Sequence, residues 1–364
     1  MRSRIVTATL FVATLVVVTA PVGRASQPSW QFSTPAAAGA LYGISASATN
    51  DVWAVGTDGS PLVEHWNGTG WSVVSTPLLP FGGGTLRAVA TLPSGRAWAV
   101  GTQTGAPDGR QWTLIETWTG TRWRVVPSPN WFEGDPADDN ELRAVSAVSP
   151  SDVWAAGTAT MDGSIHHNII EHWDGSSWSM TGALSPGTQW NQLYGISMAS
   201  LSAGFAVGEF ASRRFVHPLA ERWRNAQWHL SRIAASPRLS LLGVTTPSAS
   251  QAWAVGLLDT GSIYPVIEHF VKGSGWTSVS PGVPGRGRLD AIAASSPSDM
   301  WAVGIDGEQP NATFFLHWDG TEWTHVAGPS SSSPGLWAVT TVPGSSEAWA
   351  VGADDNGTII LHYA

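Results

Sequence analysis

The chain has 364 residues, no cysteine, 12% charged residues and a net charge of -9 at pH 7. The lack of cysteine excludes disulfides, a lipidated cysteine, a thiolate nucleophile and cysteine-based metal sites. The net charge is negative and the sequence contains no stripe of basic residues, so nucleic acid is a poor partner. It also contains no cluster of cationic residues that could bind an anionic membrane. The 40 glycines and 22 tryptophans indicate many short strands, tight turns and an aromatic interior.

Residues 1–25 have the pattern of a secretory signal peptide. Arg2 and Arg4 precede an apolar run from Ile5 to Ala20, and small residues follow at Gly23 and Ala25. The run is shorter than the roughly 20 residues that span a bilayer. We therefore expect cleavage near Ala25 and export, without membrane insertion of the mature chain.

Residues 27–35, "QPSWQFSTP", read as one short strand with no sequence neighbour to pair with. After it, one unit recurs seven times. The most constant part of the unit is a strand of the type "DVWAVG", and its leading aromatic returns at intervals of 45 to 56 residues, as in four-stranded propeller blades. These aromatics are Trp53, Trp98, Trp154, Phe205, Trp253, Trp301 and Trp349.

Each unit predicts four strands. A first strand such as "LYGISA" leads through a tight turn into the "WAVG" strand, and a third strand such as "IIEHW" follows. In six units a fourth strand that begins with Trp comes next, and in several of them an Asn-Gly or Asp-Gly turn joins it to the third strand. The last unit stops after its third strand, and "SWQFSTP" matches "GWSVVSTP" of the first unit. We therefore predict an all-β, seven-bladed β-propeller whose ring is closed by the N-terminal strand. The expected blades are residues 41–77, 86–129, 142–186, 193–237, 241–281, 289–329, and 336–364 with 29–35, all within a mature domain of residues 26–364.

Packing between blades follows from the alternation of side chains along a strand. In "WAVG", Trp and Val project to one face and Ala and Gly to the other. A Trp of one blade is thus expected to fill the space above the small residues of its neighbour.

The repeat resembles the secreted, Trp-rich propeller repeats common in actinomycetes. More remotely it is similar to BNR/Asp-box and photosystem-assembly-factor propellers, whose blades carry a GWAVG-like strand and a DGG-x-T-W turn. The segment from Asp174 to Trp178, "DGSSW", is one residue shorter than that turn and lacks the preceding Ser. The resemblance therefore implies the fold and carries no sialidase activity.

Recurrent Glu-His pairs, such as Glu64-His65 and Glu171-His172, have the residue types of a general base with its orienting acid. Their repetition in several blades favours a framework role. His166-His167 has no accompanying ligand spacing for a metal.

The acidic segment "EGDPADDNE", residues 133–141, offers oxygen ligands suited to Ca²⁺ but lacks the EF-hand order, so a solvated loop is the alternative. Its metal candidates are Asp135, Asp138, Asp139 and Glu141.

No nucleophile elbow, phosphate loop, dinucleotide fingerprint or zinc-protease motif occurs. The second positions of the seven first strands are expected to line a central funnel. They are Tyr42, Arg87, Arg143, Tyr194, Leu242, Asp290 and Trp337. Only Asp290 is acidic, so this set predicts no glycosidase acid pair, and its two arginines leave a sialidase-type trio incomplete.

Tryptophans outside the framework mark a candidate ligand surface. Propeller topology places Trp112, Trp131, Trp190 and Trp337 on the face that carries the longer loops, with Phe132 beside Trp131. Indole rings stack on sugars or pack in protein interfaces; covering blade edges is the alternative. The candidate ligand-binding residues are Trp112, Trp131, Phe132, Trp190, Trp337, Arg87, Arg143 and Asp290.

The sequence thus predicts a secreted, monomeric, non-catalytic binding module for a glycan or cell-envelope polymer, with no cofactor unless Ca²⁺ binds the acidic segment. Two alternatives stay open. One is an extracellular glycosidase- or lyase-like enzyme, favoured by an acid pair near Asp290 and the acidic segment. The other is a scaffold that binds an extracellular protein, favoured by flat apolar display of the spare tryptophans.

Overall fold

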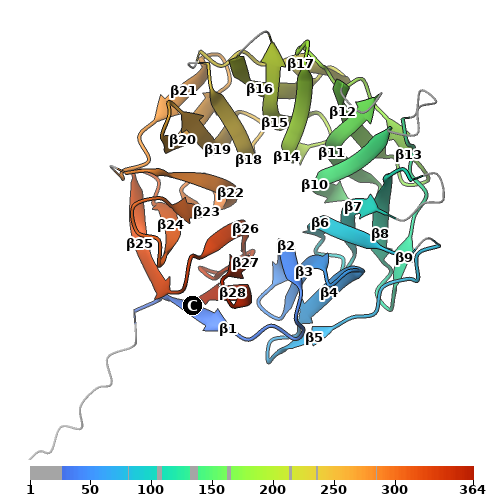
Figure 1. The fold of residues 1–364 in the computed structure, drawn as a ribbon, viewed down its shortest axis with the longest axis horizontal. Helices are drawn as coiled ribbons and strands as arrows, with labels where there is room; N and C mark the ends of the chain where they lie inside the picture. Colours follow the sequence, from blue (N-terminus) through green and yellow to red (C-terminus); the bar gives the residue numbers. More distant parts are fainter. Residues whose placement is uncertain are drawn as a thin grey trace, which may run out of the picture.

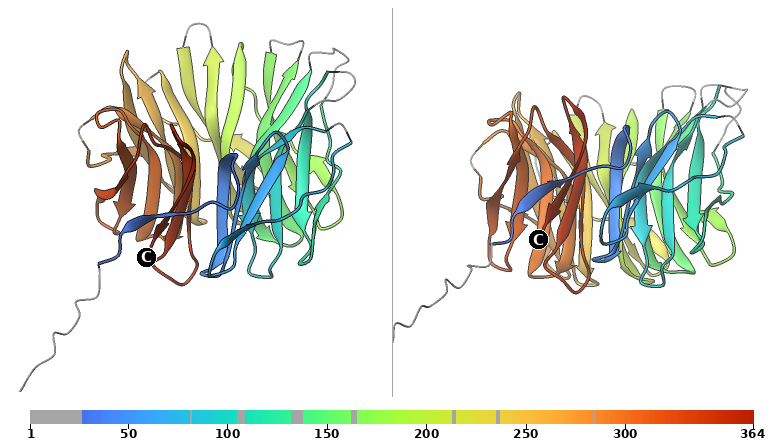
Figure 2. Two further views of the ribbon diagram at one scale, coloured as in Figure 1. Left: turned by 60° about the horizontal axis from the view of Figure 1, so that its bottom comes forward. Right: turned by 90° about the horizontal axis from the view of Figure 1, so that it is seen from below.

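The computed structural model describes residues 27–80, 82–104, 109–131, 138–161, 165–212, 215–234, 237–283 and 285–364. These residues form 28 strands and contain no helix, so no described segment is a helix able to cross a membrane. Figure 1 shows seven sheets arranged around a central axis, and Figure 2 shows them standing on edge. The predicted all-β, seven-bladed propeller is confirmed.

Each sheet is antiparallel with four strands, which run in chain order from the axis outward except that β1 is the outermost strand of blade 7. We number the blades from 1, which is β2–β5, to 7. The first strands are β2 (Ala40–Ala48), β6 (Gly84–Thr91), β10 (Asp139–Ser149), β14 (Trp190–Ser200), β18 (Leu239–Ser248), β22 (Gly287–Ser296) and β26 (Gly335–Thr341). The second strands are β3 (Asp51–Thr57), β7 (Ala97–Gln103), β11 (Asp152–Met161), β15 (Ala203–Ser212), β19 (Gln251–Asp259), β23 (Asp299–Asp306) and β27 (Ala348–Asp354). The third strands are β4 (Pro61–Trp66), β8 (Trp112–Trp118), β12 (Ile165–Trp173), β16 (Phe215–Arg224), β20 (Ile263–Val271), β24 (Ala312–Trp318) and β28 (Gly357–Tyr363). The outer strands are β5 (Trp71–Val73), β9 (Trp123–Val125), β13 (Trp178–Met180), β17 (Gln227–Leu230), β21 (Gly275–Val279), β25 (Trp323–Ser330) and, in blade 7, β1 (Trp30–Ser33).

The N-terminal strand closes the ring. β1 pairs antiparallel with β28, from Trp30 opposite Tyr363 to Ser33 opposite Ile360, and the two lie side by side in Figure 1. The indole of Trp30 is 2% exposed. It stacks on Phe315 of blade 6 with ring centroids 4.0 Å apart. The unpaired strand of the sequence is therefore the fourth strand of blade 7.

The core lies between blades. Each of seven buried clusters joins two neighbouring blades; in one, Trp53 and Val55 of blade 1 lie against Ala97 and Ala99 of blade 2. This confirms the predicted packing of Trp over the Ala of the neighbouring motif. The ring centroid of Trp53 also lies 5.3 Å from that of Trp123 on β9. At the closure, Trp301 of blade 6 contacts Trp30 in the same way, at 5.1 Å.

Candidate functional site

A β-bulge at the same position in every first strand builds the lining of the central axis. The pairing with the second strand skips one residue, for example Tyr42 between Leu41 and Gly43. The same shift occurs in all seven blades, and the leucine before each skipped residue is fully buried. A bulge re-aims a side chain. The skipped residues are the seven that the sequence predicts for the funnel: Tyr42, Arg87, Arg143, Tyr194, Leu242, Asp290 and Trp337.

The glycine of "WAVG" makes room for this bulge. A Cβ on Gly56 would lie 1.7 Å from the carbonyl oxygen of Ala40 in the first strand of the same blade. In the other six blades the corresponding separation is 1.9 to 2.0 Å. No other residue fits such a close approach of two backbones. This glycine therefore faces its own blade, and only the Ala of the motif receives the neighbour's Trp.

The bulge residues line a cavity of about 560 Å³ at the end of the axis where the first strands begin. Its wall is completed by Glu141, Ser240 and Arg288, each two residues before a bulge residue, and by Glu209 and Leu257 from second strands. A narrower space of about 200 Å³ continues along the axis, lined by the bulge residues and the small and apolar residues that follow them.

One side of the cavity is a three-residue ion-pair network. The Nε of Arg87 lies 2.9 Å from Oε1 of Glu141, and an Nη of Arg143 lies 2.8 Å from Oε2 of the same carboxylate. Glu141 thus joins blades 2 and 3 and is neutralised by two guanidinium groups. The side chains of Arg87 and Arg143 stay 39% and 30% exposed, so their remaining donors face the cavity.

Two more carboxylates line the cavity, Glu209 on blade 4 and Asp290 on blade 6. The Nε of Arg288 donates to Asp290 at 3.1 Å. Burial raises the pKa of Asp290, and the neighbouring Arg288 opposes that shift. Glu209 accepts hydrogen bonds from the hydroxyls of Ser240 and Tyr194. The cavity therefore holds three arginines and three carboxylates, each carboxylate held by a protein donor.

Aromatic rings complete the lining. Trp337 stacks on Tyr42 with centroids 5.2 Å apart, and the guanidinium of Arg87 lies 4.9 Å from the Tyr42 centroid on the ring's face. Arg143 lies similarly over Tyr194, at 5.2 Å. These contacts fix the arginines over π faces, so the polar groups are pre-oriented before any ligand enters.

The structure corrects the expectation that the funnel has no second acid. Glu141 and Glu209 share the cavity with Asp290. The sequence argument named Glu141 only within the acidic segment, as a metal candidate and as a possible acid partner of Asp290. It missed Glu209 and Arg288 because the funnel set took one position per first strand, whereas the cavity also uses the position two residues earlier and the second strands. The period of two along a strand is the signal that could have found Glu141 and Arg288.

Among the predicted ligand-binding residues, the structure brings together Arg87, Arg143, Asp290 and Trp337. Trp112 starts β8, Trp190 starts β14, and Trp131 lies on the linker before β10; none of the three lines the central cavity. Phe132 lies outside the described residues.

Trp131 is held in place by a buried amide. Asn140 accepts a hydrogen bond from the Trp131 backbone N–H at 2.9 Å and donates to its carbonyl at 3.1 Å. The Trp131 side chain is 36% exposed, and its centroid lies 5.2 Å from that of His167. Trp131 is thus a fixed, accessible aromatic surface of blade 3, separate from the central cavity.

The metal candidates have other contacts. Asp135 lies outside the described residues. Asp138 is buried, Asp139 accepts a hydrogen bond from the Gln111 backbone, and Glu141 is paired with two arginines. Across the described ranges, no three His, Asp or Glu side chains are grouped as a metal would need. Calcium binding stays an untested prediction.

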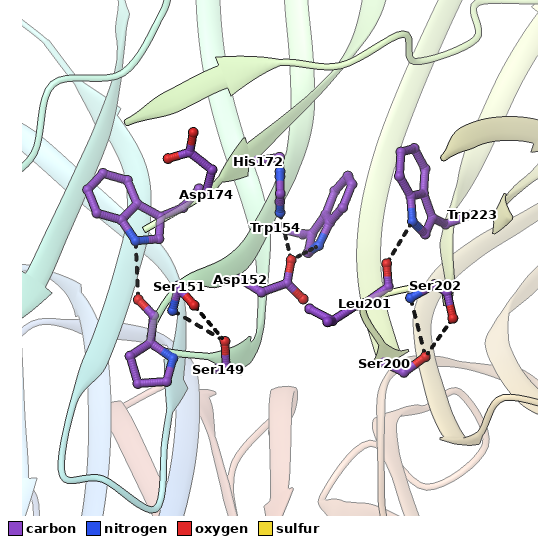
Figure 3. Close-up of polar contacts among 12 residues, drawn as sticks. Ser149, Ser151, Asp152, Trp154, His172, Asp174, Ser200, Leu201, Ser202 and Trp223 are labelled. Carbon is purple, nitrogen blue, oxygen red and sulfur yellow. Dashed lines mark hydrogen bonds and ion pairs between the residues drawn. The ribbon is translucent and has the colours of Figure 1, made fainter. Parts of the chain in front are cut away.

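The Glu-His pairs belong to the framework. In Figure 3, His172 points to Asp152, 2.6 Å away, and Trp154 donates to the same carboxylate oxygen. The figure also shows Trp223 donating to the carbonyl of Leu201, a tie between the third strand and the turn that recurs in blades 1, 3 and 6. The adjacent Glu171 is buried on the other face of the strand, so it does not orient His172.

No family model and no curated protein matches this sequence. Solved structures do match. One, "YCF48 bound to D1 peptide", has a TM-score of 0.61 and 14% identity and covers 93% of this chain and 98% of its own. YCF48 from Cyanidioschyzon merolae has a TM-score of 0.58 and 15% identity and covers 92% and 98%. At these identities the likeness concerns the fold alone: this chain is a seven-bladed β-propeller similar in architecture to these two YCF48 structures.

Proposed function

We propose that this propeller is a non-catalytic binding module that holds a segment of a partner polypeptide in its central cavity. The observation that carries the proposal is the lining, in which three arginines and three carboxylates lie beside stacked aromatic rings. A polypeptide presents donors, acceptors, charges of both signs and apolar side chains. A lining without net charge fits such a chain better than it fits a polyanion.

Size and precedent support the proposal. A cavity of about 560 Å³ is within the range of about 300–1,000 Å³ usual for ligand sites. The structural neighbour whose title reads "YCF48 bound to D1 peptide" is a protein of this fold that binds a peptide. The lining residues also stand on strands of a rigid ring, which keeps the ordering cost of binding low.

The test is selection of linear 12-residue peptides from a phage-displayed library on the purified chain. We expect selected peptides to lose at least about tenfold in affinity for Arg143→Ala, because one guanidinium of the cavity is removed. Arg122→Ala, in the exposed turn between β8 and β9, is the matched control and should bind as wild type. Both variants are first checked for wild-type melting. Equal affinity of all three proteins would contradict the proposal.

A glycan or cell-envelope polymer is the second candidate, favoured by the fixed and accessible ring of Trp131. An indole face held in one orientation is suited to stacking on a sugar ring. The test is co-sedimentation with insoluble polysaccharides and isolated cell walls, with and without Ca²⁺. We expect binding to be lost in a Trp112/Trp131/Trp190 triple Ala variant that melts like wild type. Release of reducing sugar in the same assay would instead favour the enzyme alternative, with Asp290, Glu141 and Glu209 as its acids.

Export as a monomer is part of the proposal. It is supported by the signal-like pattern of residues 1–25, which lie outside the described residues. Recovery of the chain from the culture medium with its N-terminus near Ser26, and a monomer mass in solution, are the expected results.

A further inference from the structure

Blades 4 and 5, side by side in Figure 1, carry positive charge on a chain whose net charge is -9. Residues 190–279 contain seven arginines and lysines against four aspartates and glutamates. Of the four acids, Glu221 and Glu268 are buried and Glu209 lines the central cavity. The fourth, Asp259, ends a second strand, β19, and therefore lies toward the cavity end of the axis. The acids of these blades thus leave the other end of the propeller without a carboxylate.

This imbalance follows from changes at framework positions of the repeat. In blades 1, 3 and 6 a His of the third strand contacts an Asp that begins the second strand, as His172 contacts Asp152. In blade 4 the same two positions are Arg222 and Ala203. In blade 5 the acid is replaced by Gln251. Two neighbouring blades therefore lack the carboxylate that the framework supplies elsewhere, and one of them has gained a guanidinium.

Arg222 is held in place at the boundary of the two blades. Its guanidinium lies over the rings of Phe270 on β20 and Phe205 on β15, 4.9 Å and 5.8 Å from their centroids. Arg224 follows two residues later on the same face of β16, and Lys272 follows Phe270 by two residues. Burial and the nearby Arg224 lower the pKa of Arg222. We call Arg222, Arg224 and Lys272 the basic patch; none of them forms an ion pair with a described residue.

The basic patch lies at the end of the propeller opposite the central cavity. First strands begin at the cavity end, and third strands run in the same direction because each blade is antiparallel. Arg224 ends β16 and Lys272 comes directly after β20, so both lie at the far end. There the flanking blades 3 and 6 carry Asp174 and Asp319 in exposed turns, and hydroxyl and N–H donors of those turns lower the pKa of both to about 2. The patch is a short positive sector with negative charge on either side.

These charges indicate the kind of partner. Two guanidinium groups held close together without an anion are suited to carboxylates, which match the guanidinium fork. A polymer with a negative charge on every unit would be repelled where it passed over Asp174 or Asp319. A polypeptide is able to place its acidic residues over the patch alone.

We propose that the basic patch binds a short acidic segment of a partner polypeptide, with carboxylates paired to Arg222 and Arg224. This surface is separate from the central cavity and does not depend on what the cavity binds. Blade 2 also has exposed arginines at this end, Arg122 and Arg124. Neither lies over an aromatic ring of a described residue, so they offer charge without a fixed orientation.

The probe is a fluorescent 12-residue peptide with four consecutive glutamates among Gly and Ser residues, and its affinity is measured at low ionic strength. We expect Arg224→Ala/Lys272→Ala to weaken binding by about tenfold or more. Arg122→Ala/Arg124→Ala, the matched control, removes the same charge from blade 2 and should bind as wild type. Arg222→Gln should weaken binding as strongly, and Arg222→Lys less, because it keeps the charge and loses the fork. All variants are first checked for wild-type melting.

Four results would overturn the proposal. The first is no binding of the probe, and the second is an equal loss in the blade 2 control, which would show a general effect of net charge. The third is loss in Arg143→Ala with none in the patch variants, which would place the acidic peptide in the cavity. The fourth is inorganic polyphosphate that binds the patch more tightly than the peptide at equal charge, which would replace the polypeptide by a phosphate polymer. The phage-selected peptides test the cavity separately, so either proposal can fail while the other stands.

Discussion

The backbone carbonyl of Arg288 stands 2.0 Å from the point where a Cβ on Gly304 would lie. Gly304 ends the "WAVG" motif of blade 6, and Arg288 lies two residues before the bulge at Asp290. The most constant feature of the repeat is therefore linked sterically to the residues that line the central cavity. The "WAVG" motif, which the sequence indicates is structural, therefore also allows each first strand to direct a side chain toward the axis.

Gly304→Ala should damage both stability and the cavity. The added methyl meets backbone that cannot move without undoing the bulge, so we expect a loss of about 3 kcal/mol in the free energy of unfolding and weaker binding of any ligand of the central cavity. Urea unfolding and peptide affinity measure the two effects. Gly70→Ala is the control, because nothing lies within 4 Å of a Cβ there; similar losses in the two variants would refute the steric argument.

The sequence allowed the fold to be predicted closely and the site only in part. The strand assignment of any one unit is uncertain, but repetition of "WAVG" and of the turn residues in seven units makes the assignment secure. The last unit lacks a fourth strand, and "SWQFSTP" has the sequence pattern of a fourth strand. The bulge residues were found by their common position. Glu209 was not, because its approach to Ser240 joins β15 to β18 across a blade boundary, and no local pattern reports which side chains of two blades meet.

The tryptophans that begin the outer strands differ in whether the indole N–H donates a hydrogen bond. The residue type at one position in the outer strand of the preceding blade explains the difference. Trp71, Trp228 and Trp276 donate to the hydroxyls of Ser33, Thr181 and Ser231, each three residues after the preceding blade's own outer-strand Trp. Where that position is Val, the buried indole nitrogen has no hydrogen-bond partner among the described residues. The four cases are Trp30 after Val326, Trp123 after Val74, Trp178 after Val126 and Trp323 after Val279.

Val126→Thr should therefore stabilise the protein. The new hydroxyl gives the N–H of Trp178 an acceptor at the place that Thr181 occupies for Trp228, and a gain of about 1 kcal/mol is expected. Thr181→Val should lower the free energy of unfolding, because it leaves the buried indole N–H of Trp228 without an acceptor. Val125→Thr, at the adjacent position that is 42% exposed, controls for the change of residue type. Chemical denaturation measures all three, and a destabilising Val126→Thr would count against this reading.

Two buried carboxyls should make the protein less stable at alkaline pH. Burial raises the pKa of Glu116 and Glu171 to about 8 from the usual 4.5, and neither carboxyl has a hydrogen-bond partner among the residues the structure describes. Both are protonated in the folded protein at neutral pH, whereas the unfolded chain releases these protons above about pH 4.5. The stability contributed by each group is therefore fully present below pH 4.5, falls as the pH rises and is lost above about pH 8.

A Glu116→Gln/Glu171→Gln variant isolates this effect. Glutamine keeps the shape of the protonated acid and does not ionise. The variant should therefore have the wild-type melting temperature near pH 4.5 and a melting temperature that exceeds that of wild type by more and more as the pH rises toward 9. Glu322→Gln, in an exposed turn, should follow the wild-type curve. The comparison is a series of thermal melts in matched buffers. Parallel curves for wild type and the double variant would show that these carboxyls do not titrate between folded and unfolded states.

The closure of the ring should depend on Trp30 more than on the rest of its strand. Trp30 is buried against Phe315, Trp301 and Tyr363, whereas Phe32 on the same strand is 48% exposed. Trp30→Ala should cost about 3–5 kcal/mol, as for deletion of a buried aromatic ring, and Phe32→Ala should cost little.

The consequence of losing Trp30 differs from that of losing an equivalent Trp elsewhere. β21, which carries Trp276, follows β20 through a short turn and stays beside it after Trp276→Ala, but β1 is joined by sequence only to blade 1. Release of β1 would expose the hydrogen-bonding edge of β28, which favours association of chains. We expect Trp30→Ala, and not Trp276→Ala, to form oligomers on mild heating, measured by light scattering. Oligomers from both variants, or from neither, would show that ring closure does not depend on the Trp30 side chain.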